Sequence, residues 1–117
     1  MNKKEELLQS ICNNEGMSII HGTHRNEDLI PSFMEVINIF DPEKAKELKA
    51  KYPEMEKALK ELEDSEESSY FESEESSYLV NEVLFDVLDS FAPANYYFGS
   101  HPGDGSDFGF WKAEYLD

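Results

Sequence analysis

The chain has 117 residues, a usual length for one domain (residues 1–117), and 39% of them are hydrophobic, which favours a folded core over a disordered chain. Its 26 acidic residues outnumber 10 basic ones and give a net charge of −16. This charge disfavours direct binding to nucleic acid or to an anionic membrane, because both need a basic surface. It favours a basic protein as partner.

The amino-terminal part predicts a helix over residues 3–14. Cys12, the only cysteine, lies beside Ile11 on the apolar side of that helix, so we expect it to be buried and no internal disulfide to form. The chain shows no secretion signal and no apolar stretch of membrane-spanning length, which predicts a cytoplasmic protein. Residues 17–23 are partly β-branched and predict a strand or extended segment.

Two further helical regions follow. Asp28 predicts the start of a helix that runs to Phe40, with Pro31 in its first turn. Residues 42–63 predict another helical region with a break near Tyr52, because Pro53 lies inside it. Its apolar positions form a short seam with alternating spacing, for which core packing is favoured over dimerisation. These positions are Leu48, Tyr52, Met55, Leu59 and Leu62.

The carboxyl-terminal half predicts an acidic loop, a helix and a hairpin. The hexapeptide Ser-Glu-Glu-Ser-Ser-Tyr occurs twice within residues 64–78, and we expect 64–77 to be an exposed low-complexity loop. Residues 77–91 predict a helix with apolar residues on one face. Two aromatic runs, 95–99 and 107–111, predict a β-hairpin with a long loop. The fold class is therefore α+β, mainly helical, with about four helices and a small antiparallel C-terminal β-hairpin.

The hairpin loop is the best candidate for a catalytic or metal-binding site. It brings an imidazole and two carboxylates within seven residues: His101, Asp104 and Asp107. Oxygen ligands of this kind suit a hard cation, but the spacing is not that of an EF-hand, and a structural turn is favoured. His21 and His24, with Cys12, do not have the spacing of a recognised zinc motif, and we expect Arg25 to pair with a carboxylate.

The distribution of charge is more informative than any motif. No lysine or arginine lies between Lys60 and Lys112, whereas 13 carboxylates do. Lysines gather instead in residues 44–60, where glutamates lie at helical spacing. An array of unneutralised carboxylates can occupy a basic, nucleic-acid-binding groove. The residues expected to contact such a partner are Glu66, Glu67, Glu74, Glu75, Glu82, Asp86 and Asp89. The last three lie at i, i+4 and i+7 and are expected to share one face of the helix.

Two blocks of the sequence form a recognisable pattern. One block spans residues 23–33. The other runs from Leu84 through Tyr97-Phe98-Gly99-Ser100-His101-Pro102-Gly103-Asp104-Gly105-Ser106-Asp107-Phe108-Gly109-Phe110-Trp111. Together they resemble an uncharacterised family of small acidic proteins of phages and mobile elements. The resemblance implies a mobile-element setting, in which small acidic proteins often disarm host defence, and implies no catalytic residues.

These observations favour a non-enzymatic inhibitor or binding protein without a cofactor. Its partner would be the basic surface of a host defence protein, in the manner of an anti-CRISPR or anti-restriction protein. Three alternatives remain open: a metal-dependent module at residues 101–107, a phage assembly subunit, and an acidic surface that only maintains solubility. The sequence is compatible with a monomer or a homodimer.

Overall fold

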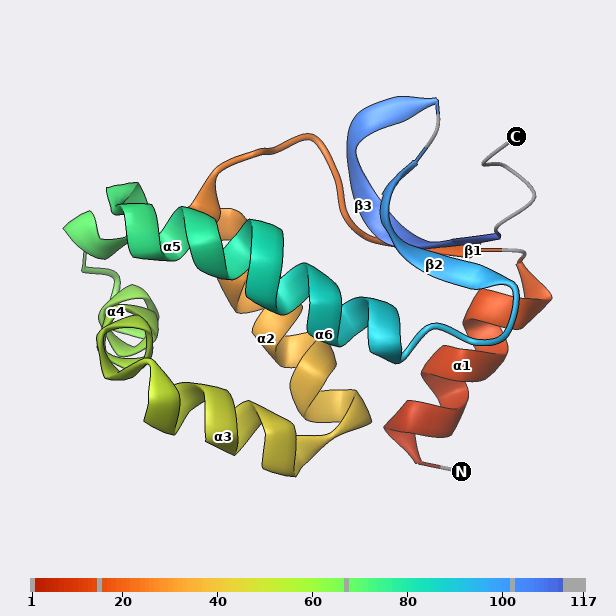
Figure 1. The fold of residues 1–117 in the computed structure, drawn as a ribbon, viewed down its shortest axis with the longest axis horizontal. Coiled ribbons are helices and arrows are strands. Elements are labelled where there is room, and N and C mark those ends of the chain that lie inside the picture. Colours follow the sequence, from red (N-terminus) through yellow and green to blue (C-terminus); the bar gives the residue numbers. More distant parts are fainter. Residues whose placement is uncertain (1, 15, 67, 102, 113–117) are drawn as a thin grey trace.

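The computed structural model describes residues 2–14, 16–66, 68–101 and 103–112 and confirms the α+β fold class (Figure 1). Its elements, in chain order, are α1 (Lys3–Asn13), β1 (Gly16–Ile20), α2 (Asn26–Phe40), α3 (Pro42–Lys51), α4 (Pro53–Glu63), the 3₁₀ turn η1 (Ser69–Glu72), α5 (Glu74–Tyr78), the π-helix η2 (Leu79–Leu84), α6 (Phe85–Ser90), β2 (Tyr96–His101) and β3 (Asp104–Lys112).

The sheet has three antiparallel strands in the order β1-β3-β2, so the predicted hairpin is extended by β1. β1 and β3 approach closely at Gly109, where a Cβ atom would overlap the carbonyl of Met17. Only glycine fits at that position, which explains why an aromatic strand contains it. The expected long loop is wrong: His101 pairs with Asp104, so β3 begins inside the segment that was expected to form the loop.

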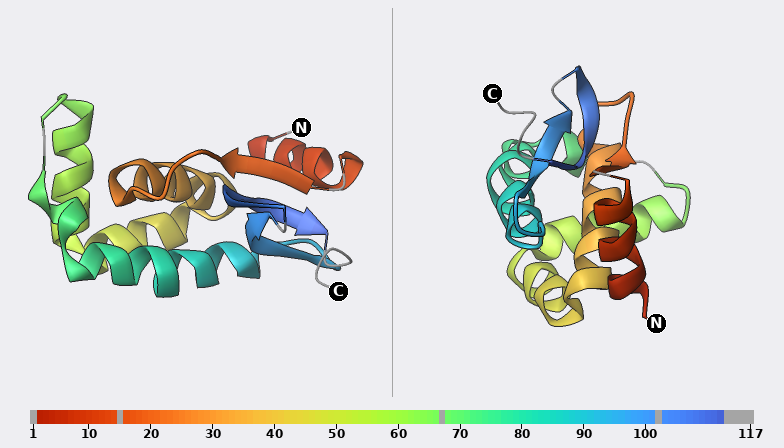
Figure 2. Two further views of the ribbon diagram at one scale, coloured as in Figure 1. Left: turned by 90° about the horizontal axis from the view of Figure 1, so that it is seen from above. Right: turned by 90° about the vertical axis from the view of Figure 1, so that its right-hand side faces the viewer.

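The core lies between the sheet, α2 and the chain segment that contains α5, η2 and α6. Figure 2 shows α2 and that helical segment on either side of the molecule's interior, with the sheet at one end. Phe33 from α2 meets Phe98 and Phe108 from the strands in edge-on contacts, with ring centroids 5.3 and 6.1 Å apart. Such contacts stabilise the core beyond simple area burial.

The start of α2 differs from the prediction. The helix begins at Asn26, and Asp28 lies in its first turn, where its carboxylate accepts a hydrogen bond from the Thr23 hydroxyl (2.7 Å) instead of capping the helix. Pro31 consequently lies inside the helix and not in its first turn. The earlier start adds only Asn26, Glu27 and Asp28 to the helix, and the residues of α2 that are buried in the core all follow them.

The break near Tyr52 is confirmed, because α3 ends at Lys51 and α4 begins at Pro53. Each of these helices has a proline at its first position, where the missing N–H costs nothing. The Asp41 side chain accepts a hydrogen bond from Lys44 N and caps α3. Leu48 and Met55 of the predicted seam are buried within this chain, as expected for core packing.

The acidic segment is not a loop throughout. Residues 69–72 form a 3₁₀ turn, and α5 begins at Glu74, so the second copy of the repeat is largely helical. Phe71 and Ser76 are both buried. The Ser76 hydroxyl lies within hydrogen-bonding distance of two carbonyl oxygens, those of Phe71 (3.0 Å) and Ser73 (2.7 Å). These local contacts fold the segment against the protein, and Glu67 lies outside the described residues.

The helix predicted for 77–91 exists, but it starts earlier and contains a π-helix. We call residues 74–90, which form α5, η2 and α6, the helical rod. Ser76, Val80, Leu84 and Leu88 are buried and recur every four residues, and Leu79 is buried beside them, whereas Val83 and Val87 are only half-buried. A π-turn holds about one more residue than an α-turn, so it keeps this four-residue series facing the core.

Candidate functional site

Charge is segregated along the chain. Residues 64–111 contain eleven carboxylates and no lysine or arginine, whereas residues 42–63 contain six lysines and six glutamates. In α3 and α4, the pairs Lys44–Glu47, Lys46–Glu43 and Lys60–Glu56 have N–O distances of 3.5, 3.9 and 3.8 Å. One part of the molecule is thus neutral overall, and most of the net charge lies on the helical rod, its preceding turn and the hairpin.

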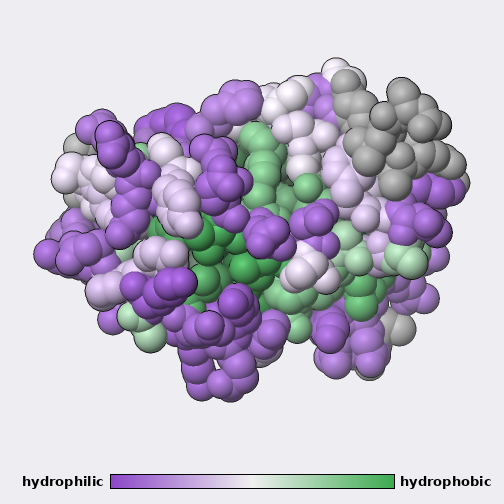
Figure 3. Space-filling model, in the orientation of Figure 1, coloured by the Kyte–Doolittle hydropathy of each residue, from purple (hydrophilic) through white to green (hydrophobic). Residues whose placement is uncertain are grey.

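The helical rod presents an acidic face with an aromatic residue in it. Glu74, Tyr78 and Glu82 are exposed and recur at four-residue intervals. Tyr78, at 55% exposure, is the single large hydrophobic residue exposed in the described part of the chain. Figure 3 shows hydrophilic residues around this side of the molecule and an apolar band across its middle. Exposed tyrosines of this kind are enriched at protein interfaces.

Three of the predicted partner-binding residues come together at one end of the rod. Glu82, Asp86 and Asp89 line a shallow hollow of about 340 Å³ between α6 and β2. The β2 side of this hollow is formed by Tyr97 and Phe98. The helical spacing i, i+4, i+7 in the sequence therefore places these carboxylates together, as expected.

Asp89 also has a structural role that the sequence did not reveal. Its Oδ1 accepts a hydrogen bond from the backbone N of Phe98 (3.0 Å). This bond satisfies a backbone donor of β2 and fixes α6 against the strand. One carboxylate of the hollow is consequently held in place by the fold.

The other predicted partner-binding residues lie elsewhere. Glu75 lines a separate cleft that also contains Lys57 of α4, and burial of Tyr70 in that cleft raises the pKa of its hydroxyl, with the Glu75 carboxylate adding to the effect. Glu66 is exposed just after α4. The predicted set is therefore divided, and the hollow with the adjoining rod is the part that forms a continuous surface.

The residues of the alternative metal site, for which a structural turn was favoured, form hydrogen bonds with other residues of the protein. His101 Nδ1 accepts from Gly103 N (2.9 Å), and Asp107 Oδ1 accepts from the Ser18 hydroxyl (2.5 Å). Asp104 Oδ1 accepts from the backbone N of Ser106 (3.0 Å), and this bond lowers the pKa of Asp104. Within the described ranges, no group of three or more His, Cys, Asp or Glu residues is arranged to hold a metal ion.

The histidine pair and Cys12 form no common site. The His24 ring packs edge-on against Phe108, with centroids 5.6 Å apart, and His21 is exposed. Cys12 is exposed, which corrects the prediction that it is buried; Ile11 beside it fills the core instead. The helical stripe of α1 thus ends one residue earlier than the sequence suggested.

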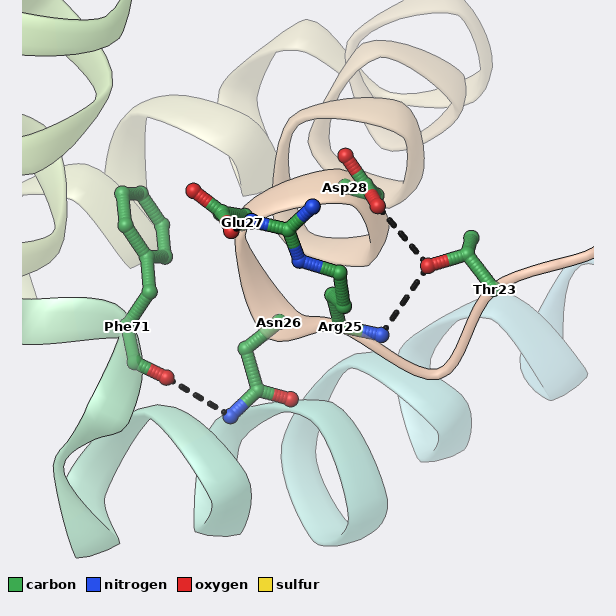
Figure 4. A network of polar contacts seen from close by, with 6 residues as sticks. All are labelled: Thr23, Arg25, Asn26, Glu27, Asp28 and Phe71. Carbon is green, nitrogen blue, oxygen red and sulfur yellow. Dashed lines mark hydrogen bonds and ion pairs between the residues drawn. The ribbon is translucent and has the colours of Figure 1, made fainter. Parts of the chain in front are cut away.

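A groove of about 650 Å³ at the amino-terminal end of α2 was not anticipated. Arg25 forms an ion pair with Glu27 at its rim, as expected for the sole arginine. The Asn26 amide donates to the Phe71 carbonyl (3.1 Å) and ties this end of α2 to η1 (Figure 4). The groove depends on contacts between residues more than 40 positions apart, which no local sequence signal reveals.

Comparisons with protein-family models, curated proteins and solved structures find no match to this chain. No helix in the described ranges has both the length and the apolar character needed to cross a membrane.

Proposed function

We propose that this chain is a non-enzymatic binding protein whose acidic helical rod occupies a basic, nucleic-acid-binding surface of a host defence protein, such as a CRISPR effector or a restriction enzyme. The observation that supports the proposal is the segregation of charge: eleven carboxylates without one basic residue in 64–111. A structured element displays part of this charge, since Glu74, Glu82 and Asp86 project from a helix packed on the core.

The physical basis is mimicry of a phosphate backbone. Acidic residues one helical turn apart have Cβ atoms about 5–6 Å from each other, close to the spacing of phosphates along a DNA strand. A groove lined with lysine and arginine that binds phosphates will also attract such a surface. Because both ligands use the same cationic side chains, the protein and the nucleic acid compete.

The test is a competition assay with a purified CRISPR effector or restriction endonuclease and a fluorescent DNA duplex. The variant Glu82→Lys/Asp86→Lys reverses two charges on the rod, and Asp89 is left intact because it holds Phe98 N. We expect at least about a tenfold loss of inhibitory potency, since like charges facing each other at an interface cost several kcal/mol.

The matched control is Glu5→Lys/Glu6→Lys on α1, which changes net charge by the same amount. Figure 2 shows α1 on the opposite side of the molecule from the rod. We expect the inhibitory potency of this control to fall by less than about threefold, because only long-range attraction to the partner is weakened. Equal losses in the two variants, or inhibition that is unaffected by both, would contradict the proposal.

A further inference from the structure

β2 is an edge strand with a composition that favours pairing with other strands. In the order β1-β3-β2 it is bonded to β3 on one side only, and α6 lies next to its other side (Figure 2). Residues 95–100 read Asn-Tyr-Tyr-Phe-Gly-Ser, with three adjacent aromatic residues, no charge and no proline. Segments of this kind at an open sheet edge readily add a strand from another copy of the chain. This edge therefore has to be blocked if the protein is to avoid self-association.

The backbone groups on the outer side of β2 are engaged by the protein itself. Residues along an antiparallel edge strand direct their N–H and C=O groups alternately toward the neighbouring strand and away from it. Three of the groups that point away from β3 have partners within the chain: Tyr96 N donates to Pro93 O (2.9 Å), Phe98 N donates to Asp89 Oδ1 (3.0 Å), and Ser100 O accepts from the Tyr97 hydroxyl (3.3 Å). A strand that added to this edge would need the same groups.

We propose that Asp89 guards this edge: its carboxylate occupies the central outward donor of β2 and prevents the strand from pairing with β2 of a second copy. Of the three bonds, the one to Asp89 has a charged acceptor, and such bonds are roughly twice as strong as bonds between neutral groups. A strand could replace this acceptor only by displacing the carboxylate from Phe98 N. The inference is independent of the proposed function, because it concerns contacts between copies of this chain.

The carboxylates beside the edge add a second barrier. Glu82 and Asp86 are exposed and line the hollow between α6 and β2. An antiparallel pair of β2 strands is two-fold symmetric, so it brings the same residues of both copies together, and like charges that face each other at an interface are destabilising. Salt weakens this repulsion far more than it weakens a direct hydrogen bond, so measurements at moderate salt isolate the contribution of Asp89.

The experiment measures the mass of the full chain by sedimentation velocity in about 0.15 M NaCl at about 10 µM to 1 mM protein, the range in which open strand edges associate. We expect Asp89→Ala to form dimers or larger species at concentrations at least about tenfold lower than the wild type, because Phe98 N is freed in both copies. Asp89→Asn should follow the wild type, since its amide oxygen can still accept the bond.

The matched control is Asp86→Ala, which removes the same charge from α6 without freeing Phe98 N. Urea unfolding verifies that the variants are folded, and Asp89→Ser, whose oxygen is one bond short of the position of Oδ1, replaces Asp89→Ala if the latter does not fold. A folded Asp89 variant of this kind that associates no more than Asp86→Ala would overturn the inference.

A proline shows whether the new contact is made through β2. Ser100 directs its backbone groups away from β3, so Ser100→Pro leaves the bonds between β2 and β3 intact and removes a donor from the outer side only. We expect the double variant Asp89→Ala/Ser100→Pro to return to the mass of the wild type, because proline cannot bond to an added strand. If the double variant associates as strongly as Asp89→Ala, the copies meet through another surface or through partial unfolding, and the inference is wrong.

Discussion

Tyr70 lies in the cleft between α4 and η1 with its hydroxyl buried. Within the described part of the chain this oxygen has no partner with hydrogen-bond geometry; the Glu75 carboxylate is near enough to act on the Tyr70 pKa as an acceptor but lies outside that geometry. Burial raises the pKa of Tyr70 above its ordinary value of 10.0, and the nearby Glu75 carboxylate raises it further, because both disfavour a phenolate there. The folded protein therefore holds the Tyr70 proton more tightly than the unfolded chain.

The substitution Tyr70→Phe tests this effect on stability. With the folded pKa above the unfolded one, the contribution of Tyr70 is fully present below about pH 10 and is lost as the pH rises beyond it, because the unfolded chain then releases the proton first. We expect the variant to be as stable as the wild type at pH 7, or up to about 1 kcal/mol more stable, because a buried hydroxyl without a partner is costly. Above pH 10 it should lose less stability than the wild type.

Urea unfolding at pH 7 and at pH 10.5 measures both effects. Tyr78→Phe, which removes an exposed hydroxyl, serves as the control and should follow the wild type at both pH values. A Tyr70→Phe variant that is clearly destabilised at pH 7 would show that the hydroxyl makes a favourable bond.

Among the elements, those fixed by local chemistry were predictable and those fixed by tertiary contacts were not. The break at Tyr52 follows from a proline at each helix start, and the strand pairing of 96–101 with 104–112 follows from two aromatic runs separated by turn residues. The contribution of β1 to the sheet depends on the close approach of Gly109 to Met17, and these two residues are far apart in the sequence.

The π-helix is the clearest case of a feature set by the core. Its signal was present in the sequence as a four-residue repeat of small or apolar positions, Ser76, Val80, Leu84 and Leu88, but the same residues also fit an ordinary helical stripe. For the candidate site, the i, i+4, i+7 spacing correctly grouped Glu82, Asp86 and Asp89. The aromatic side of the hollow comes from β2 and required the fold.

Deleting Asn81 tests the role of the π-helix. This exposed residue lies within η2, and removing one residue from a π-turn leaves an α-turn that keeps both flanking faces toward the core. We expect the deletion to change the free energy of unfolding by no more than about 1 kcal/mol, the net worth of one backbone hydrogen bond.

The control is deletion of Asn38, an exposed residue within the regular helix α2. There the loss of one residue rotates the rest of the helix and moves Phe40 out of register with the core, so we expect a severely destabilised protein. Circular dichroism during urea unfolding compares the two. If the two deletions lower the free energy of unfolding equally, the π-turn does not contain an extra residue that the protein can lose without rotating the helix.

At the scale of the whole molecule, the unequal distribution of charge makes the stability of the protein depend on ionic strength. The molecule measures 38 × 32 × 23 Å, and at 0.01 M salt the screening length is about 30 Å, so carboxylates repel one another across almost the entire protein. At 0.15 M the screening length falls to about 8 Å, and only neighbouring carboxylates still interact strongly. Salt has the opposite effect on the paired charges of α3 and α4, because it weakens their attraction and so reduces their contribution to stability.

We therefore expect the melting temperature to rise by several degrees when NaCl is raised from about 0.01 to 0.15 M, because compaction of a highly charged chain is opposed by self-repulsion. Neutralising the rod with Glu82→Gln/Asp86→Asn should raise the melting temperature at low salt and reduce its rise with salt. Neutralising Glu43 and Glu47 instead leaves Lys46 and Lys44 unpaired and should give no such gain. Scanning calorimetry at the two salt concentrations measures the difference. If both double variants respond to salt like the wild type, repulsion along the rod does not limit stability, and the premise of an unneutralised acidic face loses its support.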